Sequence, residues 1–363
     1  MMPLALACAD AGHDVVIATG QPFLDRLPLP TVPGNPHSLA LDWAIQESRR
    51  RHPDLHGGEL SMAMFADVTA EQIAPTMIEQ CERTLPDLVI FEGLDTGAGV
   101  AASVLGIPAA AYAIVLASRV YGLLHPATVS YQRALWVQRD RTPPEGTSPL
   151  AHALINPAPP SLRPTDGIEA PTISIRSIAY NESNAGVPTW LNASRTRPRV
   201  YLTLGTVSFG AVEVISRAIA EIAPLDVDIL VTVGPEGDPT ALGEVSSNVH
   251  VERFVAQSAV LPMVDLIVHH GGTGTVLGAL EAGLPQLVLP QGADQFFNAE
   301  ILAAAGVARA LQNDAQRPGA ITEAVQALVG DSPERQAAAR VRDEIAAMPS
   351  PAEVVPALVD LAS

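Results

Sequence analysis

Apolar positions in this chain form two kinds of pattern that alternate along its length. Short apolar runs bounded by turn residues, such as 88–91, 199–204 and 266–269, are typical of strands buried on both faces. Between them lie longer segments with apolar residues at helical spacing, such as 97–105 and 212–222. Strands that alternate with helices in this way predict βαβ units, and therefore an α/β fold with parallel sheets.

The expected elements divide between two halves of the chain. In the first half we expect strands at 15–19, 88–91, 109–114 and 172–175, and helices at 2–10, 39–51, 63–85, 97–105 and 120–139. In the second half we expect strands at 199–204, 228–233, 250–251, 266–269 and 286–290, and helices at 212–222, 256–263, 333–347 and 352–361. Residues 143–198 are rich in proline, and apart from the strand at 172–175 we expect loops there.

This order of elements predicts two domains followed by a helix. We expect a first domain over residues 1–192, a second over 193–348, and a C-terminal helix over 349–363 that packs back on the first domain. A doubly wound domain normally opens with a strand, whereas this chain opens with a helical pattern. Because that strand would lie near the middle of the sheet, we expect one of two outcomes. Either the chain's start is internal to a longer coding frame, or the first sheet is built abnormally.

The stretch from 264 to 306 carries the most chemistry. A buried strand runs into the glycine-rich turn GGTGT at 271–275, a helix follows, and a second strand leads into the loop QGADQ. The glycines permit positive φ angles and close approach of a ligand to the backbone, and the threonines are expected to cap the helix. A helix N-terminus at the carboxyl end of a parallel strand binds anions, here most naturally a diphosphate. His270 adds a donor, and Asp294 and Gln295 are placed to bind hydroxyl groups of the same ligand.

The charge of the chain limits the classes of partner that it is expected to bind. The 363 residues carry 21 basic and 39 acidic side chains, a net charge of −18, and the sequence contains no lysine. Such a surface argues against binding to the nucleic-acid backbone or attachment to an anionic membrane. Nothing resembles a signal peptide or a transmembrane stretch, so we expect a cytoplasmic protein. The two cysteines, Cys8 and Cys81, lack metal-type spacing, and no metal site is expected.

One long segment resembles a known family. The run RFVAQSAVLPMVDLIVHHGGTGTVLGALEAGLPQLVLPQGADQFFNAE, which starts at Arg253, closely resembles the nucleotide-sugar signature of family 1 glycosyltransferases. YLTLGT at 201–206 and PDLVIFEG at 86–93 resemble the bacterial branch of that family, which glycosylates natural products. The resemblance covers essentially the whole chain. It implies the GT-B fold, in which two Rossmann-like doubly wound domains face a cleft.

The resemblance also implies which residues bind the donor. Phe254 would stack on the pyrimidine, and Val255 would bond the base through its backbone. Gln257 is the glutamine of the signature, although Ala256 stands where the family usually has proline. The remaining donor-binding positions implied by the resemblance are Gly205, Thr206, His270, Gly272, Thr273, Gly274, Thr275, Asp294 and Gln295.

The implied activity is transfer of a sugar, expected to be a deoxysugar, from a dTDP- or UDP-sugar to a hydroxyl group of a small natural-product acceptor. Plant relatives carry a glutamate for the ribose hydroxyls eight residues after the histidine. This chain has Gly278 there, which favours a deoxyribose and hence dTDP. The family reaction inverts the anomeric centre and needs no metal or cofactor. The expected partners are the nucleotide sugar and the acceptor, with the chain as a monomer or homodimer.

The acid–base residues of the family match this chain only in part. The usual base is a histidine in the loop after the first strand, which has no counterpart here, and His13 lies in a different element. Glu92 matches the family carboxylate that often orients the base, and Asp95 lies three residues further on. Either could act as the base, but a carboxyl group with an ordinary pKa of about 4 is a weak base at neutral pH.

The sequence bears on four other classes of protein. The first is a catalytically inactive nucleotide-sugar-binding homologue or partner subunit, which the absent histidine favours and the intact donor signature disfavours. A nucleotide-sugar epimerase can share the architecture, but the signature fits it less well. GTGTVLG imitates a dinucleotide fingerprint but has no acidic residue closing the next strand, and a lysine-free chain has no P-loop.

Overall fold

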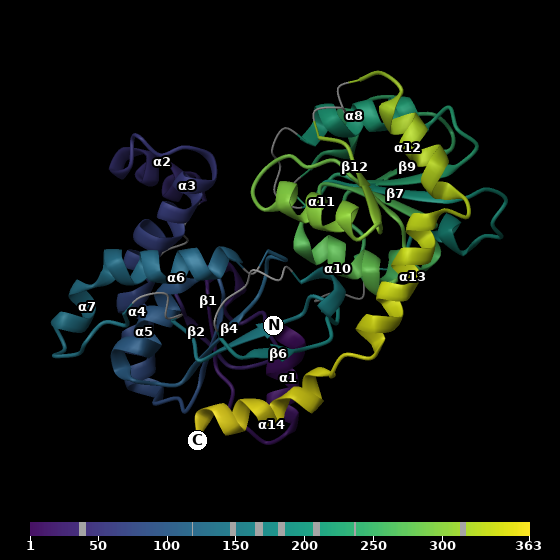
Figure 1. Ribbon diagram of the computed structural model, residues 1–363. Helices are drawn as coiled ribbons and strands as arrows, with labels where there is room; N and C mark the ends of the chain where they lie inside the picture. The colour runs from purple at the N-terminus through teal and green to yellow at the C-terminus, as the bar shows by residue number, and fades with distance from the viewer. Residues whose placement is uncertain are drawn as a thin grey trace. The chain divides into compact units, whose positions relative to one another are not determined.

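The chain divides into two compact units (Figure 1). The structure, a computed structural model, describes residues 1–35, 41–117, 119–145, 150–163, 170–180, 186–205, 211–235, 237–312 and 317–363. Unit 1 comprises Met1–Pro157, Pro164–Arg176 and Pro349–Ser363, and unit 2 comprises Ala158–Arg163 and Ser177–Met348. No described helix is by itself long and apolar enough to cross a membrane.

Unit 1 contains two parallel sheets within the described residues, with strand orders β1-β2 and β3-β4-β5-β6. Its strands are β1 (Ile17–Thr19), β2 (Thr31–Pro33), β3 (Val89–Glu92), β4 (Ala109–Tyr112), β5 (Ala153–Asn156) and β6 (Thr172–Ser174). Its helices are α1 (Met2–Asp10), α2 (Leu41–Arg51), α3 (Gly57–Ala63), α4 (Ala70–Thr84), α5 (Thr96–Leu105), α6 (Arg119–Gln132), α7 (Ala134–Val137) and α14 (Pro351–Ala362). A π-helical segment, Met64–Thr69, joins α3 to α4.

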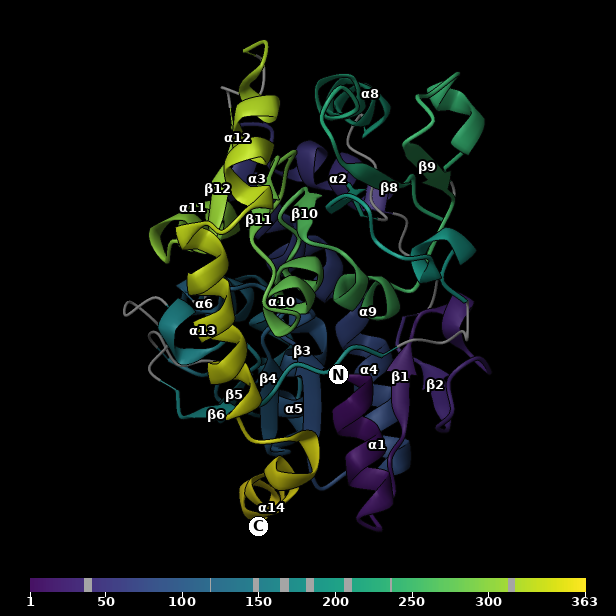
Figure 2. The ribbon, with the colours of Figure 1, turned by 90° about the vertical axis from the view of Figure 1, so that its right-hand side faces the viewer.

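The larger sheet of unit 1 is covered on both faces. Helices α4, α5 and α6 pack on one face, where Phe91 and Ala111 join their core. Helices α1 and α14 lie side by side on the other face (Figures 1 and 2). There Leu4, Val354 and Leu358 share a core with residues of the sheet. The two ends of the chain therefore meet in one hydrophobic core.

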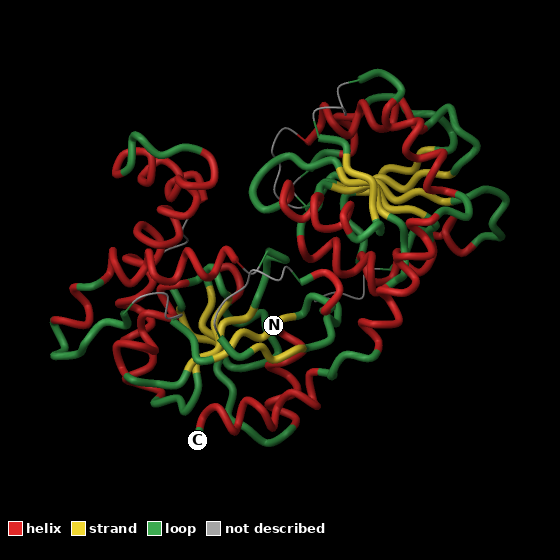
Figure 3. Tube along the Cα trace, viewed as in Figure 1, coloured by secondary structure: helices red, strands yellow, loops and turns green. Residues whose placement is uncertain are grey.

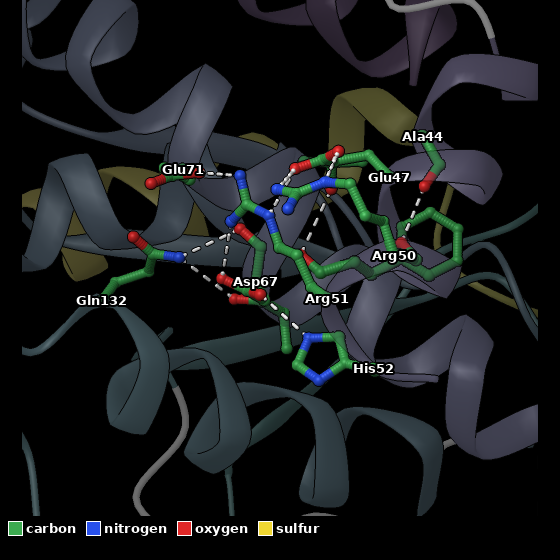
Figure 4. A network of polar contacts seen from close by, with 12 residues as sticks. Ala44, Glu47, Arg50, Arg51, His52, Asp67, Glu71 and Gln132 are labelled. Carbon is green, nitrogen blue, oxygen red and sulfur yellow. Dashed lines mark hydrogen bonds and ion pairs between the residues drawn. The ribbon is translucent and has the colours of Figure 1, made fainter. Parts of the chain in front are cut away.

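Helix α2 is attached to the rest of unit 1 mainly through charge. It buries only Ala44 and Ser48, whereas Arg51 at its end contacts three carboxylates (Figure 4). The nitrogens of Arg51 lie 2.8 Å from Glu47, 3.3 Å from Asp67 of the π-helical segment and 2.6 Å from Glu71 of α4. Hydrogen bonds from Arg50 and Arg51 lower the pKa of Glu47 to about 2. Glu47 lies within α2, so the contacts of Arg51 with Asp67 and Glu71 are the ones that attach α2 to the π-helical segment and to α4.

The described residues of unit 2 form one parallel sheet with helices on both faces (Figure 3). Its strands are β7 (Arg199–Thr203), β8 (Asp228–Thr232), β9 (Val249–Glu252), β10 (Leu266–His269), β11 (Gln286–Val288) and β12 (Ala308–Ala310). Its helices are α8 (Ala211–Ile222), α9 (Gln257–Val260), α10 (Thr273–Glu281), α11 (Gln295–Ala304), α12 (Ala320–Val329) and α13 (Pro333–Ala346).

Alternation along the strands of unit 2 explains its two cores. Val200 and Leu202 of β7 join the core formed with α8 and α12. Tyr201, between them, faces the opposite core with Leu261 and Ala279, where α9 and α10 pack (Figure 2). Successive side chains of a strand point to opposite faces, so one short apolar run supplies both cores.

Several elements differ from the prediction. Strand β5 lies in the proline-rich region expected to be loop, although all four of its residues are buried. The helix expected at 63–85 begins with the π-helical segment Met64–Thr69 and is α-helical only from Ala70, and the helix expected at 120–139 breaks between α6 and α7. Strand β12 and helix α12 were not predicted.

The boundary between the units also differs from the one expected. Residues 177–192 were assigned to the first domain, but their contacts place them in unit 2. The reason is visible at Arg199 of β7, whose guanidinium donates to the carbonyl oxygen of Leu191 at 2.7 Å. Leu191 itself is buried in the core with Tyr201. A buried strand residue thus ties this connecting segment to the second sheet.

Candidate functional site

The strand order of unit 2 locates a binding site. The sheet runs β9-β8-β7-β10-β11-β12, so the chain proceeds outward from β7 in one direction and from β10 in the other. Ligands of doubly wound folds bind at such a switch point, outside the carboxyl ends of the strands. Here β7 ends at Thr203 and leads into Gly205, and β10 ends at His269 and leads into the glycine-rich turn. The two segments expected to bind a donor therefore begin at neighbouring strand ends.

A cavity of about 620 Å³ within unit 2 collects part of the expected site. Six candidates line it, namely Gly205, Phe254, Val255, Gln257, Gly274 and Thr275. The other described candidates, His270, Gly272, Thr273, Asp294 and Gln295, are not among its lining residues. Thr206 lies outside the described residues. The structure thus brings the base-binding segment and the start of α10 together.

The sequence missed other residues that line this cavity. They include Ile178, Tyr180, Tyr201, Thr203, Thr232 and Arg253. The Tyr201 hydroxyl lies 3.0 Å from the Thr232 hydroxyl, and burial raises the pKa of Tyr201. The motif YLTLGT could have indicated Tyr201 and Thr203, but Ile178 and Tyr180 follow loop-rich sequence with no pattern. Phe254 is half exposed, with its ring available for stacking.

The start of α10 is an open anion site. Gly272 is the N-cap residue, and no side chain in the described part of the chain caps the helix. The prediction that the threonines cap it is wrong, because the Thr273 hydroxyl instead donates to Asp294 Oδ2 at 3.0 Å. Gly274 and Thr275 of the first turn line the cavity. The N–H groups of an uncapped first turn and the helix dipole both favour a negatively charged ligand.

His270 sits between two glycines at this turn. A Cβ atom on Gly205 would lie 2.7 Å from His270 Cε1, and one on Gly272 would overlap His270 Nε2. The Nδ1 atom of His270 is buried without a hydrogen-bond partner in the described part of the chain. Burial lowers the pKa of His270, and the carboxylate of Asp294 opposes that shift. A buried imidazole with an unused nitrogen is suited to receive an anionic ligand.

His269, the last residue of β10, has a structural role. It is fully buried, its Nδ1 accepts from the Gly271 N–H at 3.0 Å, and its Nε2–H donates to Gln286 Oε1 at 2.8 Å. Burial lowers its pKa to about 3, so the ring is neutral at physiological pH. Both nitrogens are used, so of these two neighbouring histidines it is His270 whose Nδ1 has no partner among the described residues.

Asp294 and Gln295 are held by neighbouring residues. Asp294 Oδ2 accepts from Thr273 and, at 2.8 Å, from the side-chain amide of Asn298. Gln295 Oε1 accepts from the backbone N–H groups of Gln291 at 2.8 Å and of Gly292 at 3.1 Å. The pair is therefore fixed in position by hydrogen bonds. Asn298 is a site residue that the sequence did not indicate.

Glu92 and Asp95 of unit 1 differ from ordinary carboxyl groups. Glu92 ends β3, and its Oε1 accepts from the Leu94 N–H at 2.9 Å. Burial raises the pKa of Glu92 to about 7, with Asp95 adding to the shift, and burial raises the pKa of Asp95 to about 6. The expectation of a weak base with a pKa near 4 is corrected by this burial. A carboxyl group that titrates near neutral pH is suited to general base catalysis.

A third titratable group lies beside this loop. His125 of α6 is buried, its Nε2–H donates to the carbonyl oxygen of Gly93 at 3.2 Å, and its Nδ1 accepts from Leu150 N–H. Burial lowers its pKa to about 4. His125 therefore stays neutral and supports the backbone next to Glu92.

Solved structures resemble the chain over its whole length. The glycosyltransferase SnogD from Streptomyces nogalater aligns with a TM-score of 0.84 and 30% sequence identity, covering 100% of this chain and 95% of that chain. Spinosyn rhamnosyltransferase SpnG complexed with thymidine diphosphate aligns with a TM-score of 0.82 and 26% identity, covering 99% and 95%. The parallel α/β units and these neighbours define the class: the chain is a glycosyltransferase of the GT-B fold.

Family models identify the branch of this class. The N-terminal and C-terminal domain models of erythromycin biosynthesis protein CIII-like match residues 6–205 and 216–361. The chain belongs to the erythromycin biosynthesis protein CIII-like family. L-demethylnoviosyl transferase of Streptomyces niveus is 34% identical over 375 residues, which cover 99% of this chain and 93% of that relative. Membership of a family of transferases favours an enzyme over an inactive binding protein.

Proposed function

We propose that the chain transfers a deoxysugar from a dTDP-sugar, or from its UDP counterpart, to a hydroxyl group of a small natural-product acceptor. The observation that carries the proposal is the uncapped N-terminus of α10, which opens on the cavity at the switch point and adjoins the unpartnered nitrogen of His270. A nucleoside diphosphate fits both features, since it combines a ring that stacks with two phosphates that need donors. The thymidine diphosphate complex of the related SpnG supports this ligand.

The nucleoside end of the donor would occupy the apolar part of the cavity. Phe254 would stack on the pyrimidine, and Ile178 and Leu261 contribute apolar surface where the thymine methyl group could lie. Gly278 of α10 also lines the cavity and offers no side chain for a ribose 2′-hydroxyl. These features favour dTDP over UDP.

Isothermal titration calorimetry tests the donor assignment. We expect dTDP to bind more tightly than UDP. We also expect thymidine, which lacks the diphosphate, to bind at least about tenfold more weakly than dTDP, because it leaves the turn and His270 unused. Equal affinity for thymidine and dTDP would show that the turn does not bind the diphosphate. Absence of binding by all three ligands would refute the proposed function.

The proposed chemistry is an inverting displacement at the anomeric carbon. Glu92, with Asp95 as the second candidate, would take the proton from the acceptor hydroxyl as its oxygen attacks the sugar. The bond to the diphosphate breaks on the opposite side of the carbon. The charge that develops on the leaving diphosphate would be stabilised by the first turn of α10 and by His270, without a metal ion.

The packing of His270 against glycine gives a test of its role. Gly272 has φ −63° and ψ 137°, which alanine adopts without strain, so the methyl group of Gly272→Ala is accommodated by the backbone but overlaps the His270 ring. We expect the dTDP affinity to fall about tenfold with little loss of thermal stability. In Gly272→Ala combined with His270→Ala the losses should not add. Gly330→Ala is the control, since its methyl group would meet open space.

A further inference from the structure

A buried polar cluster lies behind the diphosphate-binding turn, and Asn298 is at its centre. Asn298 lies on α11 and is fully buried. Its Nδ2 atom donates to the carbonyl oxygen of Gly271 at 2.9 Å, to Thr273 Oγ1 at 3.0 Å and to Asp294 Oδ2 at 2.8 Å. One side-chain amide therefore contacts both the turn that begins α10 and the carboxylate expected to bind the sugar.

The orientation of this amide follows from its neighbours. The oxygens of Gly271 and Asp294 can only accept, and the Thr273 hydroxyl already donates to Asp294. All three atoms can accept a hydrogen bond from Asn298 and none of them is free to donate one to it, so the amide nitrogen faces them. Its Oδ1 atom is buried without a partner in the described part of the chain. An unpaired buried carbonyl is unfavourable, so the oxygen does not account for an asparagine at this position. The three contacts of the nitrogen do.

The peptide groups around Gly271 are fixed from the other side as well. The N–H of Gly271 donates to His269, which Gln286 holds in one tautomer. Gly271 has φ +95°, and a Cβ atom there would lie 2.8 Å from Val288 Cγ1. The backbone next to His270 therefore has one arrangement, set by His269 on its N–H side and by Asn298 on its C=O side.

We propose that Asn298 is a positioning residue that couples the binding of the diphosphate to the binding of the sugar. The inference rests on the proposed function. A diphosphate seated on the turn fixes Gly271 and Thr273, and through the amide of Asn298 these fix Asp294 in the orientation that binds a sugar hydroxyl. The sugar then meets a carboxylate already in place, which lowers the entropy cost of binding it.

The coupling has a measurable quantity. We define the sugar increment as the ratio of the Kd of dTDP to the Kd of dTDP-glucose, which serves as a stable probe. In wild type this ratio reports what the sugar adds to binding. Asp294→Ala removes the hydroxyl contact together with the acceptor of Thr273 and Asn298. It should therefore abolish most of the increment, with a smaller effect on the dTDP affinity.

Asn298→Ala should behave differently from Asp294→Ala. We expect it to weaken dTDP binding about tenfold and also to remove most of the sugar increment, because both segments lose their common donor. In the double variant the increment should fall no further than in either single variant. Thr273→Val keeps the shape of the side chain but removes the hydroxyl between Asn298 and Asp294. We expect it to lower the increment with a smaller effect on dTDP, and it tests the proposal if Asn298→Ala does not fold.

Asn248 provides a matched control in the same unit. It is also buried, and its amide donates to the carbonyl oxygens of Ala223 at 3.1 Å and Val227 at 2.8 Å, before the start of β9. Asn248→Ala should lower the thermal midpoint as Asn298→Ala does, with unchanged Kd values. The proposal is overturned if Asn298→Ala and Thr273→Val both leave the increment within about twofold of wild type. A wild-type chain that binds neither dTDP nor dTDP-glucose would instead overturn the proposed function.

Discussion

Replacing Glu92 by glutamine is expected to lower the turnover of a dTDP-sugar by at least about 100-fold and to leave the Kd of dTDP unchanged. Glutamine keeps the hydrogen bond that Glu92 Oε1 accepts from Leu94 but cannot accept a proton. The readout is release of dTDP from the donor by transfer or by slow hydrolysis, which requires no knowledge of the natural acceptor. An inactive binding protein would show no such release in wild type.

The pH dependence of the rate provides a second readout. Burial raises the pKa of Glu92 to about 7, so the base is half ionised at that pH. The wild-type rate should rise with pH through about 7 and then level off, and Glu92→Gln should lack this rise. The raised pKa of Glu92 also affects the stability of the folded protein, which falls with rising pH while the rate increases. Glu92 is protonated in the folded state below its raised pKa, so the stability present at low pH is lost as pH rises through that value. Glu92→Gln should therefore unfold at a higher temperature than wild type at pH above the raised value.

Asp95→Asn separates the two carboxyl candidates. Asp95 caps α5 by accepting from Ala98 N–H at 3.3 Å, and asparagine caps helices equally well. We expect its rate to fall much less than that of Glu92→Gln. A larger loss in Asp95→Asn than in Glu92→Gln would exchange the roles of the two residues. Full activity of both variants would show that the base is another group.

Replacing His270 by alanine is expected to weaken dTDP binding at least about tenfold. The substitution removes a ring that fits between Gly205 and Gly272. The Nδ1 atom of this ring has no partner among the described residues. Because burial lowers the pKa of His270, the free protein holds it neutral, and an arriving diphosphate raises that pKa. The binding of dTDP to the wild-type protein should therefore be accompanied by proton uptake, and His270→Ala should abolish this uptake.

Calorimetry in buffers of different ionisation enthalpy measures this proton uptake. His56→Ala is a suitable control, since His56 is an exposed histidine of unit 1. Equal affinity and equal proton uptake in wild type and His270→Ala would contradict the role of His270 in diphosphate binding.

The alternation of strands and helices in unit 2 could be predicted from the sequence because its strands are buried on both faces. Such strands appear as uninterrupted apolar runs, and the expected strand at Leu266–His269 has the observed bounds. The weakest predictions fall where apolar runs are short or interrupted. Strand β5 contains asparagine and lies among prolines, and β12 contains an exposed arginine, so neither stands out from loop sequence.

The candidate site divides in the same way. Glycines, His270 and the pair Asp294–Gln295 lie in one contiguous signature and could be named from it. Asn298 could not be assigned a role, because its contacts with Gly271 and Asp294 depend on how α11 packs against the turn. The raised pKa of Glu92 depends on burial by residues distant in sequence, which local sequence does not report.

The shared core of α1 and α14 constrains how the protein is made. Leu4 packs with Val354 and Leu358, so that core of unit 1 is incomplete until nearly the whole chain has left the ribosome. At ordinary rates of synthesis the apolar helix α1 waits roughly 20–70 s for its partner. Most of unit 2 lies in the single segment Ser177–Met348, which is synthesised during that interval. The core between α4, α5 and α6 is synthesised before unit 2, whereas the core that α1 shares with α14 is completed only after α13, the last helix of unit 2, has been made.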